Sequence, residues 1–323
     1  MQPEINMQWG DPYVIRQALT ETLGRKIGLT KSFYEDMRYP DHFGKPSLIE
    51  HLKDLAFRQS GKRPKHLFIT AGASGAINAA LWVLKTADTD WIVTDRRFFP
   101  MYPSMADLAQ MEIITTAKRQ KLINLGVPES HMISLFASPS NPEGLVSPFE
   151  DVDIWDAAYA SYTYTQNGHV PKSYKIMCGS LAKTFGLAGL RLGWASTDDD
   201  ELAKSLGYWV TANSAGQSSV SMEIAEELIQ CLDLELFEIR SSGYLDDNRE
   251  EAQKILDKFG QGSVPKRGMF AILELGKLER KVLERANIKW LPGNAWGEDE
   301  SWARISLGQT REAVKAAVKA VLK

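Results

Sequence analysis

One segment of the chain combines a serine, a lysine and an arginine within a glycine-rich stretch. It runs from Ser180 to Trp194, directly after an apolar run that predicts a strand, and reads Ser-Leu-Ala-Lys-Thr-Phe-Gly-Leu-Ala-Gly-Leu-Arg-Leu-Gly-Trp. A lysine that acts as a nucleophile needs a partly buried, electropositive setting that lowers its pKa. Arg191 could supply that positive charge to Lys183, and its guanidinium could also hold a phosphate through paired hydrogen bonds. The glycines predict a turn here rather than a helix.

The same spacing also fits a surface loop with a solvated lysine and a salt-bridged arginine. For an isolated lysine and arginine at this distance, the surface loop is the better interpretation. The elements around the segment and further motifs along the chain are therefore needed to distinguish a reactive lysine from a surface loop.

The elements that would position this segment alternate between strands and helices. Several of the expected strands are continuous apolar runs, which is typical of strands buried on both faces, so we expect an α/β fold with a mostly parallel sheet. The expected strands are His66–Thr70, Trp91–Thr94, Glu112–Thr115, Met132–Ala137, Val152–Trp155, Tyr174–Cys178 and Arg191–Ala195, and the expected helices are Gly75–Lys85, Tyr102–Gln110, Asp199–Thr211 and Val220–Leu232.

The last hundred residues have a different pattern, which predicts a second, smaller α+β domain. We expect residues 36–215 to form the large domain and residues 216–323 the small one, with residues 1–35 as an arm that packs on the small domain or on a partner chain. The expected elements of the small domain are the helices Glu235–Phe259, Lys277–Ala286 and Thr310–Leu322 and the strands Met269–Leu275 and Ala303–Leu307.

Composition excludes several classes of function. The 323 residues hold 38 Lys and Arg against 41 Asp and Glu, and this balance argues against a nucleic-acid-binding protein. No apolar run approaches the roughly 20 residues of a membrane helix, and the N-terminus has no signal-peptide pattern. Two cysteines, Cys178 and Cys231, cannot build a disulfide framework or a four-cysteine zinc site. We therefore expect a cytoplasmic globular protein without a metal.

The segment Ser180-x-x-Lys183-x-x-Gly-x-x-Gly-x-Arg191-x-Gly resembles the cofactor-lysine motif of the class I/II aminotransferases (fold type I), and most of all the version found in histidinol-phosphate aminotransferases. The resemblance implies a fold type I protein with a large domain, whose mostly parallel mixed sheet is flanked by helices, and a small α+β domain. It also implies pyridoxal 5′-phosphate, bound to Lys183 as a Schiff base, with Ser180 and Arg191 on its phosphate. Four further segments match the family in the same chain order.

Two of these segments would hold the phosphate and the ring of the cofactor. In the turn Thr70-Ala71-Gly72-Ala73-Ser74-Gly75-Ala76-Ile77, the resemblance places the phosphate on Ala73 and Ser74, at a helix start where free N–H groups favour an anion. In Phe98-Phe99-Pro100-Met101-Tyr102, it places Phe99 over the ring. On their own, these segments also fit an ordinary turn and two core phenylalanines.

The third and fourth matches would contact the polar edge of the ring. Ser138-Pro139-Ser140-Asn141-Pro142-Glu143-Gly144 resembles the Asn-Pro-x-Gly turn of the family, whose asparagine donates to the 3′ oxygen beside the substrate. In Asp156-Ala157-Ala158-Tyr159, the aspartate matches the partner of the ring nitrogen and Tyr159 a second donor at the 3′ oxygen. An aspartate there keeps the nitrogen protonated, which makes the ring an electron sink. A helix N-cap is the alternative role of Asp156.

The fifth match and one further motif concern the substrate and the assembly. Ala303-Arg304-Ile305-Ser306-Leu307 places an arginine on a strand, where the family holds the substrate α-carboxylate with a bidentate pair. Arg38-Tyr39-Pro40 matches a motif in which the tyrosine reaches the phosphate of the partner subunit, so the resemblance implies a homodimer with Tyr39 at the interface.

Together these matches imply an aminotransferase that moves an amino group between an L-amino acid and a 2-oxo acid, with Lys183, Asp156 and Tyr159 as its catalytic residues. Some details resemble the alliinase and tryptophan-aminotransferase branch instead, among them Gly10-Asp11-Pro12 and Asn213-Ser214-Ala215-Gly216-Gln217-Ser218. Because the cofactor chemistry is shared and the sequence does not show which bond of the substrate breaks, a carbon–sulfur lyase or a decarboxylase on the same scaffold is the alternative function. A non-catalytic regulator is a third class, but no helix-turn-helix pattern precedes Tyr39.

Overall fold

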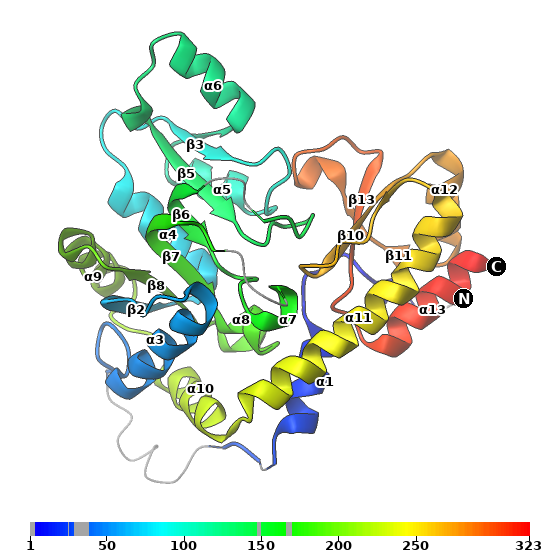
Figure 1. Ribbon diagram of the computed structural model, residues 1–323, viewed down its shortest axis with the longest axis horizontal. Coiled ribbons are helices and arrows are strands. Elements are labelled where there is room, and N and C mark those ends of the chain that lie inside the picture. Colours follow the sequence, from blue (N-terminus) through cyan, green and yellow to red (C-terminus); the bar gives the residue numbers. More distant parts are fainter. Residues whose placement is uncertain (1–3, 25, 29–38, 147–149, 166–169) are drawn as a thin grey trace.

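A computed structural model describes the chain apart from residues 1–3, 25, 29–38, 147–149 and 166–169. Its strands form a seven-stranded sheet, a four-stranded sheet and a two-stranded pair. Figure 1 shows the large sheet and its helices in one half of the molecule and the four-stranded sheet in the other half, where the C-terminus also lies.

The large sheet has the order β2-β8-β7-β6-β5-β3-β4 and is parallel except for β8, which is antiparallel to both of its neighbours. This is the mostly parallel mixed sheet that the sequence predicts. Its strands are β2 (His66–Thr70), β3 (Trp91–Thr94), β4 (Glu112–Thr115), β5 (Met132–Ala137), β6 (Asp151–Asp156), β7 (Ser173–Ser180) and β8 (Gly193–Thr197).

Helices cover both faces of this sheet, so each strand has two apolar faces to bury. One core contains α4 (Gly72–Leu84), α5 (Tyr102–Leu108) and α9 (Asp200–Ser214), packed on side chains such as Ile92 and Ile154. The opposite core, around Trp155 and Trp194, contains α1 (Tyr13–Thr22), α3 (Pro46–Ser60), α10 (Ser219–Cys231) and the start of α11 (Leu234–Phe259). The remaining elements of this half are α6 (Thr116–Asn124), η1 (Glu129–His131), α7 (Tyr162–Thr165), α8 (Leu181–Thr184) and η2 (Ala188–Leu190).

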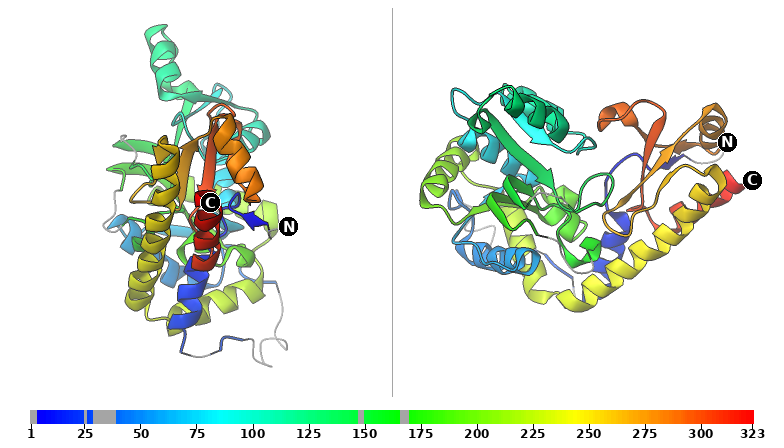
Figure 2. Two further views of the ribbon diagram at one scale, coloured as in Figure 1. Left: turned by 90° about the vertical axis from the view of Figure 1, so that its right-hand side faces the viewer. Right: turned by 45° about the horizontal axis from the view of Figure 1, so that its top comes forward.

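The four-stranded sheet is antiparallel, in the order β12-β13-β10-β9, and packs against α11 and α13 over a third core. In both views of Figure 2, α11 extends along α1 and α13. The N-terminal β1 pairs with β11, which ties the start of the chain to its last third. The elements here are β1 (Ile5–Asn6), β9 (Gly262–Ser263), β10 (Phe270–Glu274), α12 (Lys277–Arg285), β11 (Ile288–Lys289), β12 (Leu291–Pro292), η3 (Gly293–Ala295), β13 (Trp302–Ser306) and α13 (Arg311–Leu322).

Two local predictions were wrong. The strand expected from Arg191 begins at Gly193, because Arg191 adopts a left-handed conformation (φ 54°) that ends η2. Lys183 lies in the one-turn helix α8 rather than in an irregular turn, because the Ser180 hydroxyl caps α8 by accepting from the N–H of Ala182 (3.1 Å). The domain boundary near residue 215 stays a prediction.

Among the described helices, none is both long and apolar enough to span a lipid bilayer. Within the same residues, His, Cys, Asp and Glu side chains form no group of three or more that could hold a metal ion.

Candidate active site

A cavity of about 180 Å³ opens where strands of the large sheet end. Asp156 is the last residue of β6 and Ser180 the last of β7, while Asn141 follows β5 and Gly72 follows β2. In open α/β sheets, ligands bind at the carboxyl ends of the strands, so this is the expected place for a site. The lining residues are Gly72, Ala73, Ser74, Ile77, Phe99, Asn141, Asp156, Ala158, Tyr159, Ser180, Ala182, Lys183, Ala188 and Arg191.

The cavity brings together nine of the eleven site residues that the sequence predicts. They come from five separate segments of the chain, which the sheet places side by side. The two outside the lining are Arg304, which reaches the cavity through Asn141, and Tyr39.

Lys183 projects from α8 toward the N-terminal segment. Its Nζ donates a hydrogen bond to the carbonyl oxygen of Gly10 and lies 5.9 Å from the ring centre of Tyr159. A Cβ added to Gly10 would lie 3.4 Å from this Nζ and 3.1 Å from the Phe270 ring, so a residue without a side chain fits here best. Burial, and next the positive charge of Arg304, lower the pKa of Lys183 to about 8. The amine therefore has the buried, electropositive setting that a nucleophilic lysine needs.

Asp156 is buried at the floor of the cavity, with 5% of its surface exposed. Its Oδ1 accepts from the N–H of Ala158 (3.0 Å) and its Oδ2 from the hydroxyl of Tyr102 (2.8 Å). The carboxylate thus caps the turn after β6, where no helix begins, so it is not the helix N-cap of the alternative interpretation, and it also faces the cavity.

One end of the cavity is rich in hydrogen-bond donors for an anion. The helix α4 begins there with Gly72 at φ 74°, and no side chain caps its first N–H groups. The hydroxyl of Ser180 and the guanidinium of Arg191 adjoin these groups. Arg191 donates to the carbonyl oxygen of Ala188 (3.0 Å), and a Cβ on Gly72 would lie 3.2 Å from Nη2 of Arg191.

Aromatic side chains form the walls. Phe99 lies edge-on to Tyr102, with ring centres 5.6 Å apart. Tyr159 lies edge-on to Tyr164 (5.2 Å) and to Phe270 (6.0 Å). Burial raises the pKa of Tyr159 well above its ordinary value, so its hydroxyl stays protonated and available as a donor.

Arg304 is a buried cation above the cavity, with 4% of its surface exposed. It donates to Oδ1 of Asn141 (2.9 Å) and to the carbonyl oxygen of Gln8 (3.2 Å), and its guanidinium lies 4.0 Å from the Phe270 ring centre. Its Nε is buried without a partner, and no carboxylate of the described chain forms an ion pair with it. Burial lowers the pKa of Arg304 to about 10, so it remains charged at neutral pH. A buried cation without a counter-ion is a binding group for an anion.

Tyr39 is 89% exposed and does not reach the cavity of its own chain. The preceding Arg38 of the same motif lies outside the described residues. The structure therefore leaves the expected contact of Tyr39 with a partner subunit as a prediction.

The sequence interpretation did not assign several contributors to the site. Gly72, Ile77, Ala158, Ala182 and Ala188 also line the cavity. Tyr102 holds Asp156, and the carbonyl of Gly10 holds Lys183. All of Ala158, Tyr102 and Gly10 lie inside motifs that were singled out, but Gly10 is 173 positions from Lys183 and nothing local marks their contact.

Comparisons with known proteins agree on one family. The model of the family "Aminotransferase class I and II" matches residues 8–321. A tryptophan aminotransferase-related protein of Oryza sativa is 24% identical over 245 residues, which are 71% of this chain and 54% of the relative. The histidinol-phosphate aminotransferase of Caldanaerobacter subterraneus is 26% identical over 314 residues, 85% of this chain and 83% of the relative. The chain thus spans about half the length of the plant relatives that it matches.

A solved structure has the same architecture. The aromatic aminotransferase of Pyrococcus horikoshii superposes with a TM-score of 0.80 at 17% identity, over 99% of this chain and 95% of that one. At this identity the likeness is one of fold.

Proposed function

The chain belongs to the class I and II aminotransferases, and on that premise we propose that it moves an amino group from an L-amino acid to a 2-oxo acid with pyridoxal phosphate as cofactor. The observation that carries this proposal is the convergence of Lys183, Asp156 and Arg304 on one cavity. The cytoplasmic location expected from the sequence stays a prediction.

The residues present fit the cofactor that the family uses. Backbone N–H groups of Ala73 and Ser74, with Ser180 and Arg191, would hold the phosphate at the donor-rich end of the cavity. Phe99 would lie against the ring, and Asn141 and Tyr159 would donate to its 3′ oxygen. When bound, pyridoxal phosphate supplies an aldehyde for the amino group and a ring that accepts electrons from the substrate Cα.

Lys183 and Asp156 would divide the proton chemistry between them. Lys183 Nζ would take the proton from the substrate Cα and deliver it to the carbon of the cofactor that carries the aldehyde. Asp156 would hold a proton on the ring nitrogen through a charge-assisted hydrogen bond. The aromatic walls would exclude water from both transfers.

The pKa of Lys183 predicts how attachment of the cofactor depends on pH. Only the neutral amine attacks an aldehyde, and its fraction grows as the pH rises toward the pKa of about 8. We expect the rate at which the apoprotein binds pyridoxal phosphate covalently to rise about tenfold per pH unit below that value and to level off above it. Stopped-flow absorbance measures this rate. A rate that still rises above pH 10, as for an exposed lysine, would show that the amine is not in an electropositive, buried setting.

Arg304 should decide the substrate class. In Arg304→Ala, the α-carboxylate of the substrate loses a buried cationic partner. Removing one member of a buried charge pair costs about 3–5 kcal/mol, so we expect kcat/KM for amino acids to fall by about two to four orders of magnitude. Arg304→Lys should recover only part of the activity, because an ammonium cannot form the bidentate pair.

Amines without a carboxylate are the control for Arg304. They should be poor substrates of the wild type, and Arg304→Ala should hardly change their turnover. An equal loss for amines and amino acids would mean that Arg304 supports the fold rather than the substrate.

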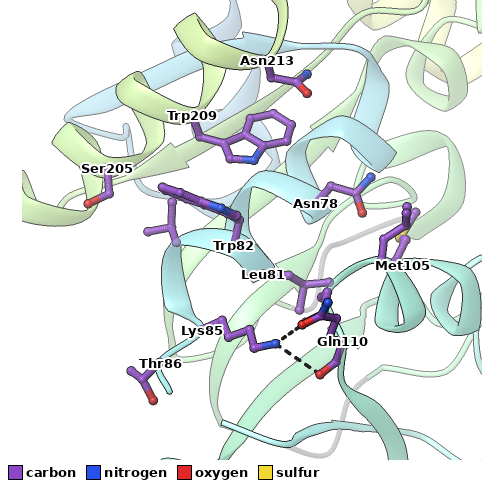
Figure 3. A pocket seen from close by; sticks show the side chains of 13 residues that line it. Asn78, Leu81, Trp82, Lys85, Thr86, Met105, Gln110, Ser205, Trp209 and Asn213 are labelled. Atoms are coloured by element: carbon purple, nitrogen blue, oxygen red, sulfur yellow. Dashed lines mark hydrogen bonds between the residues drawn. The ribbon is translucent and has the colours of Figure 1, made fainter. Parts of the chain in front are cut away.

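We also propose that the protein is a homodimer. Tyr39 is exposed, and so are two aromatic residues of neighbouring helices: Trp82 of α4 is 52% exposed, Tyr208 of α9 is 67% exposed, and their rings are stacked 6.0 Å apart. Figure 3 shows Trp82 and Trp209 above an open groove of about 750 Å³ between α4, α5 and α9. Exposed apolar surface of this kind is typical of protein–protein contacts, and symmetric dimers are the commonest assemblies.

Charge substitutions on this surface test the dimer. The double variant Trp82→Glu, Tyr208→Glu should shift the mass in light scattering from two chains toward one, because carboxylates would then face each other across a two-fold axis. Leu125→Glu is the matched control, since Leu125 is exposed beside α6, which projects away from this surface (Figure 1). A wild type that is a fully active monomer would refute the dimer and the role of Tyr39.

A further inference from the structure

We propose that Tyr102 is a positioning residue for Asp156, whose hydroxyl keeps that carboxylate ionised and aimed at the ring nitrogen of the cofactor. This inference rests on the proposed function, because it concerns the group that Asp156 would hold. Tyr102 does not line the cavity; it acts through Asp156.

Tyr102 is placed so that, among the described residues, its hydroxyl has a single hydrogen-bond acceptor, which is Asp156. Tyr102 is the first residue of α5, and only 1% of its surface is exposed. Its hydroxyl donates to Oδ2 of Asp156 at 2.8 Å. Burial and the neighbouring carboxylate raise the pKa of Tyr102 well above its ordinary value, so the hydroxyl remains a donor throughout the working pH range.

Asp156 depends on such donors because water cannot reach it freely. Burial raises the pKa of Asp156, while the hydrogen bonds from Ala158 and Tyr102 and the charge of Lys183 oppose that rise. The Ala158 N–H is fixed by the backbone of the turn, so among the described residues Tyr102 is the side chain that donates a hydrogen bond to this carboxylate. The two donors also use different oxygens, which fixes the plane of the carboxylate.

The other groups that face this pair give it no substitute donor. Lys183 acts on Asp156 only through its positive charge, and Asp156 in turn raises the pKa of Tyr159. Asp95 and Cys178 lie near Tyr102 and disfavour its ionisation. Burial raises the pKa of Cys178 well above its ordinary value, so this thiol stays neutral. Loss of the Tyr102 hydroxyl would therefore leave Oδ2 without a partner among the described side chains.

The direction of the effect follows from the basicity of the carboxylate. Without the hydroxyl, Asp156 becomes more basic and draws the shared proton away from the ring nitrogen. A ring nitrogen that has lost its proton is a weaker electron sink, so the rate falls as well. Hydrogen bonds to charged groups contribute more free energy than those between neutral groups. Because Tyr102→Phe removes one such bond, we expect kcat to fall about tenfold to a hundredfold.

The variant Tyr102→Phe removes the hydroxyl alone, since the ring and its edge-on contact with Phe99 can remain. We expect the ¹⁵N resonance of ring-labelled pyridoxal phosphate bound to this variant to move at neutral pH from the protonated toward the unprotonated pyridine position. Tyr174→Phe is the matched control: it removes a partly buried hydroxyl that faces Ser60, and it should leave the resonance in place.

The same change made in an Asp156→Asn variant shows whether Tyr102 acts by positioning Asp156 or only by supporting the fold. In Asp156→Asn, the further change Tyr102→Phe should have almost no effect on the resonance or on kcat, because the carboxylate through which it acts is absent. An unchanged resonance in Tyr102→Phe, an equal effect in both backgrounds, or loss of the folded state in Tyr102→Phe but not in Tyr174→Phe would each overturn the inference. Normal amino transfer with an unchanged resonance would refute this inference alone, whereas a changed resonance in a protein that transfers no amino group would refute only the proposed function.

Discussion

Lys183→Ala is expected to abolish amino transfer while leaving the fold intact. The side chain is both the proposed covalent anchor of the cofactor and the base at the substrate Cα, so its loss removes two functions at once. We expect kcat to fall by at least about four orders of magnitude. The packing of α8 depends on its buried neighbours Leu181 and Ala182, which the change does not touch. Steady-state kinetics and thermal melting measure the two effects separately.

Lys175→Ala is the control for this variant. Lys175 lies on β7, which leads into α8, and its exposed side chain pairs with Asp153 at the other end of the sheet. Its replacement should leave kcat within about twofold of the wild type, as is usual for exposed ion pairs. Full activity of Lys183→Ala would contradict the whole account of the site.

Asp156→Asn should still bind the cofactor but turn over about a thousandfold more slowly. The amide has nearly the same shape, and its single oxygen can still accept from one of the two donors, Tyr102 or Ala158. It carries no charge, however, and cannot keep the ring nitrogen protonated, so the ring loses most of its power to accept electrons. Tryptophan fluorescence quenching measures the affinity for the cofactor, and single-turnover kinetics measure the loss of rate.

Asp153→Asn tests whether the effect is specific to the end of β6 that faces the cavity. Asp153 lies on the same strand but bonds to Ser134 and Lys175, away from the site, so this variant should keep its rate. A near-normal rate in Asp156→Asn would leave Asp156 with only the role of capping the turn at Ala158.

Much of the large sheet could be predicted because its strands are short apolar runs between turns. The bounds of β2, β3, β4 and β5 agree with the sequence prediction. The chemistry-bearing residues could be placed because each lies directly after such a strand, where the topology brings the strand ends together. Asp156, the last residue of β6, and Ser180, the last residue of β7, are examples.

Other features depend on contacts that no local pattern encodes. The helix α3 was missed, although Pro46 at its start and Gly61 after its end are the usual signals for a helix. The left-handed conformation of Arg191 opposes the ordinary preference of a residue with a side chain, and the turn around η2 imposes it. The carbonyl oxygens of Gln8 and Gly10 meet Arg304 and Lys183 only after the N-terminal segment crosses the site.

A single half-reaction tests the central claim, amino transfer at this cavity, most directly. The purified protein with bound pyridoxal phosphate is mixed with a panel of single L-amino acids in the absence of any 2-oxo acid, and the products are counted per active site. We predict that at least one amino acid yields one equivalent of its 2-oxo acid and leaves the cofactor in the amine form, and that a 2-oxo acid then restores the aldehyde form. Continuous release of ammonia or carbon dioxide without an acceptor would contradict amino transfer and identify a lyase or a decarboxylase instead.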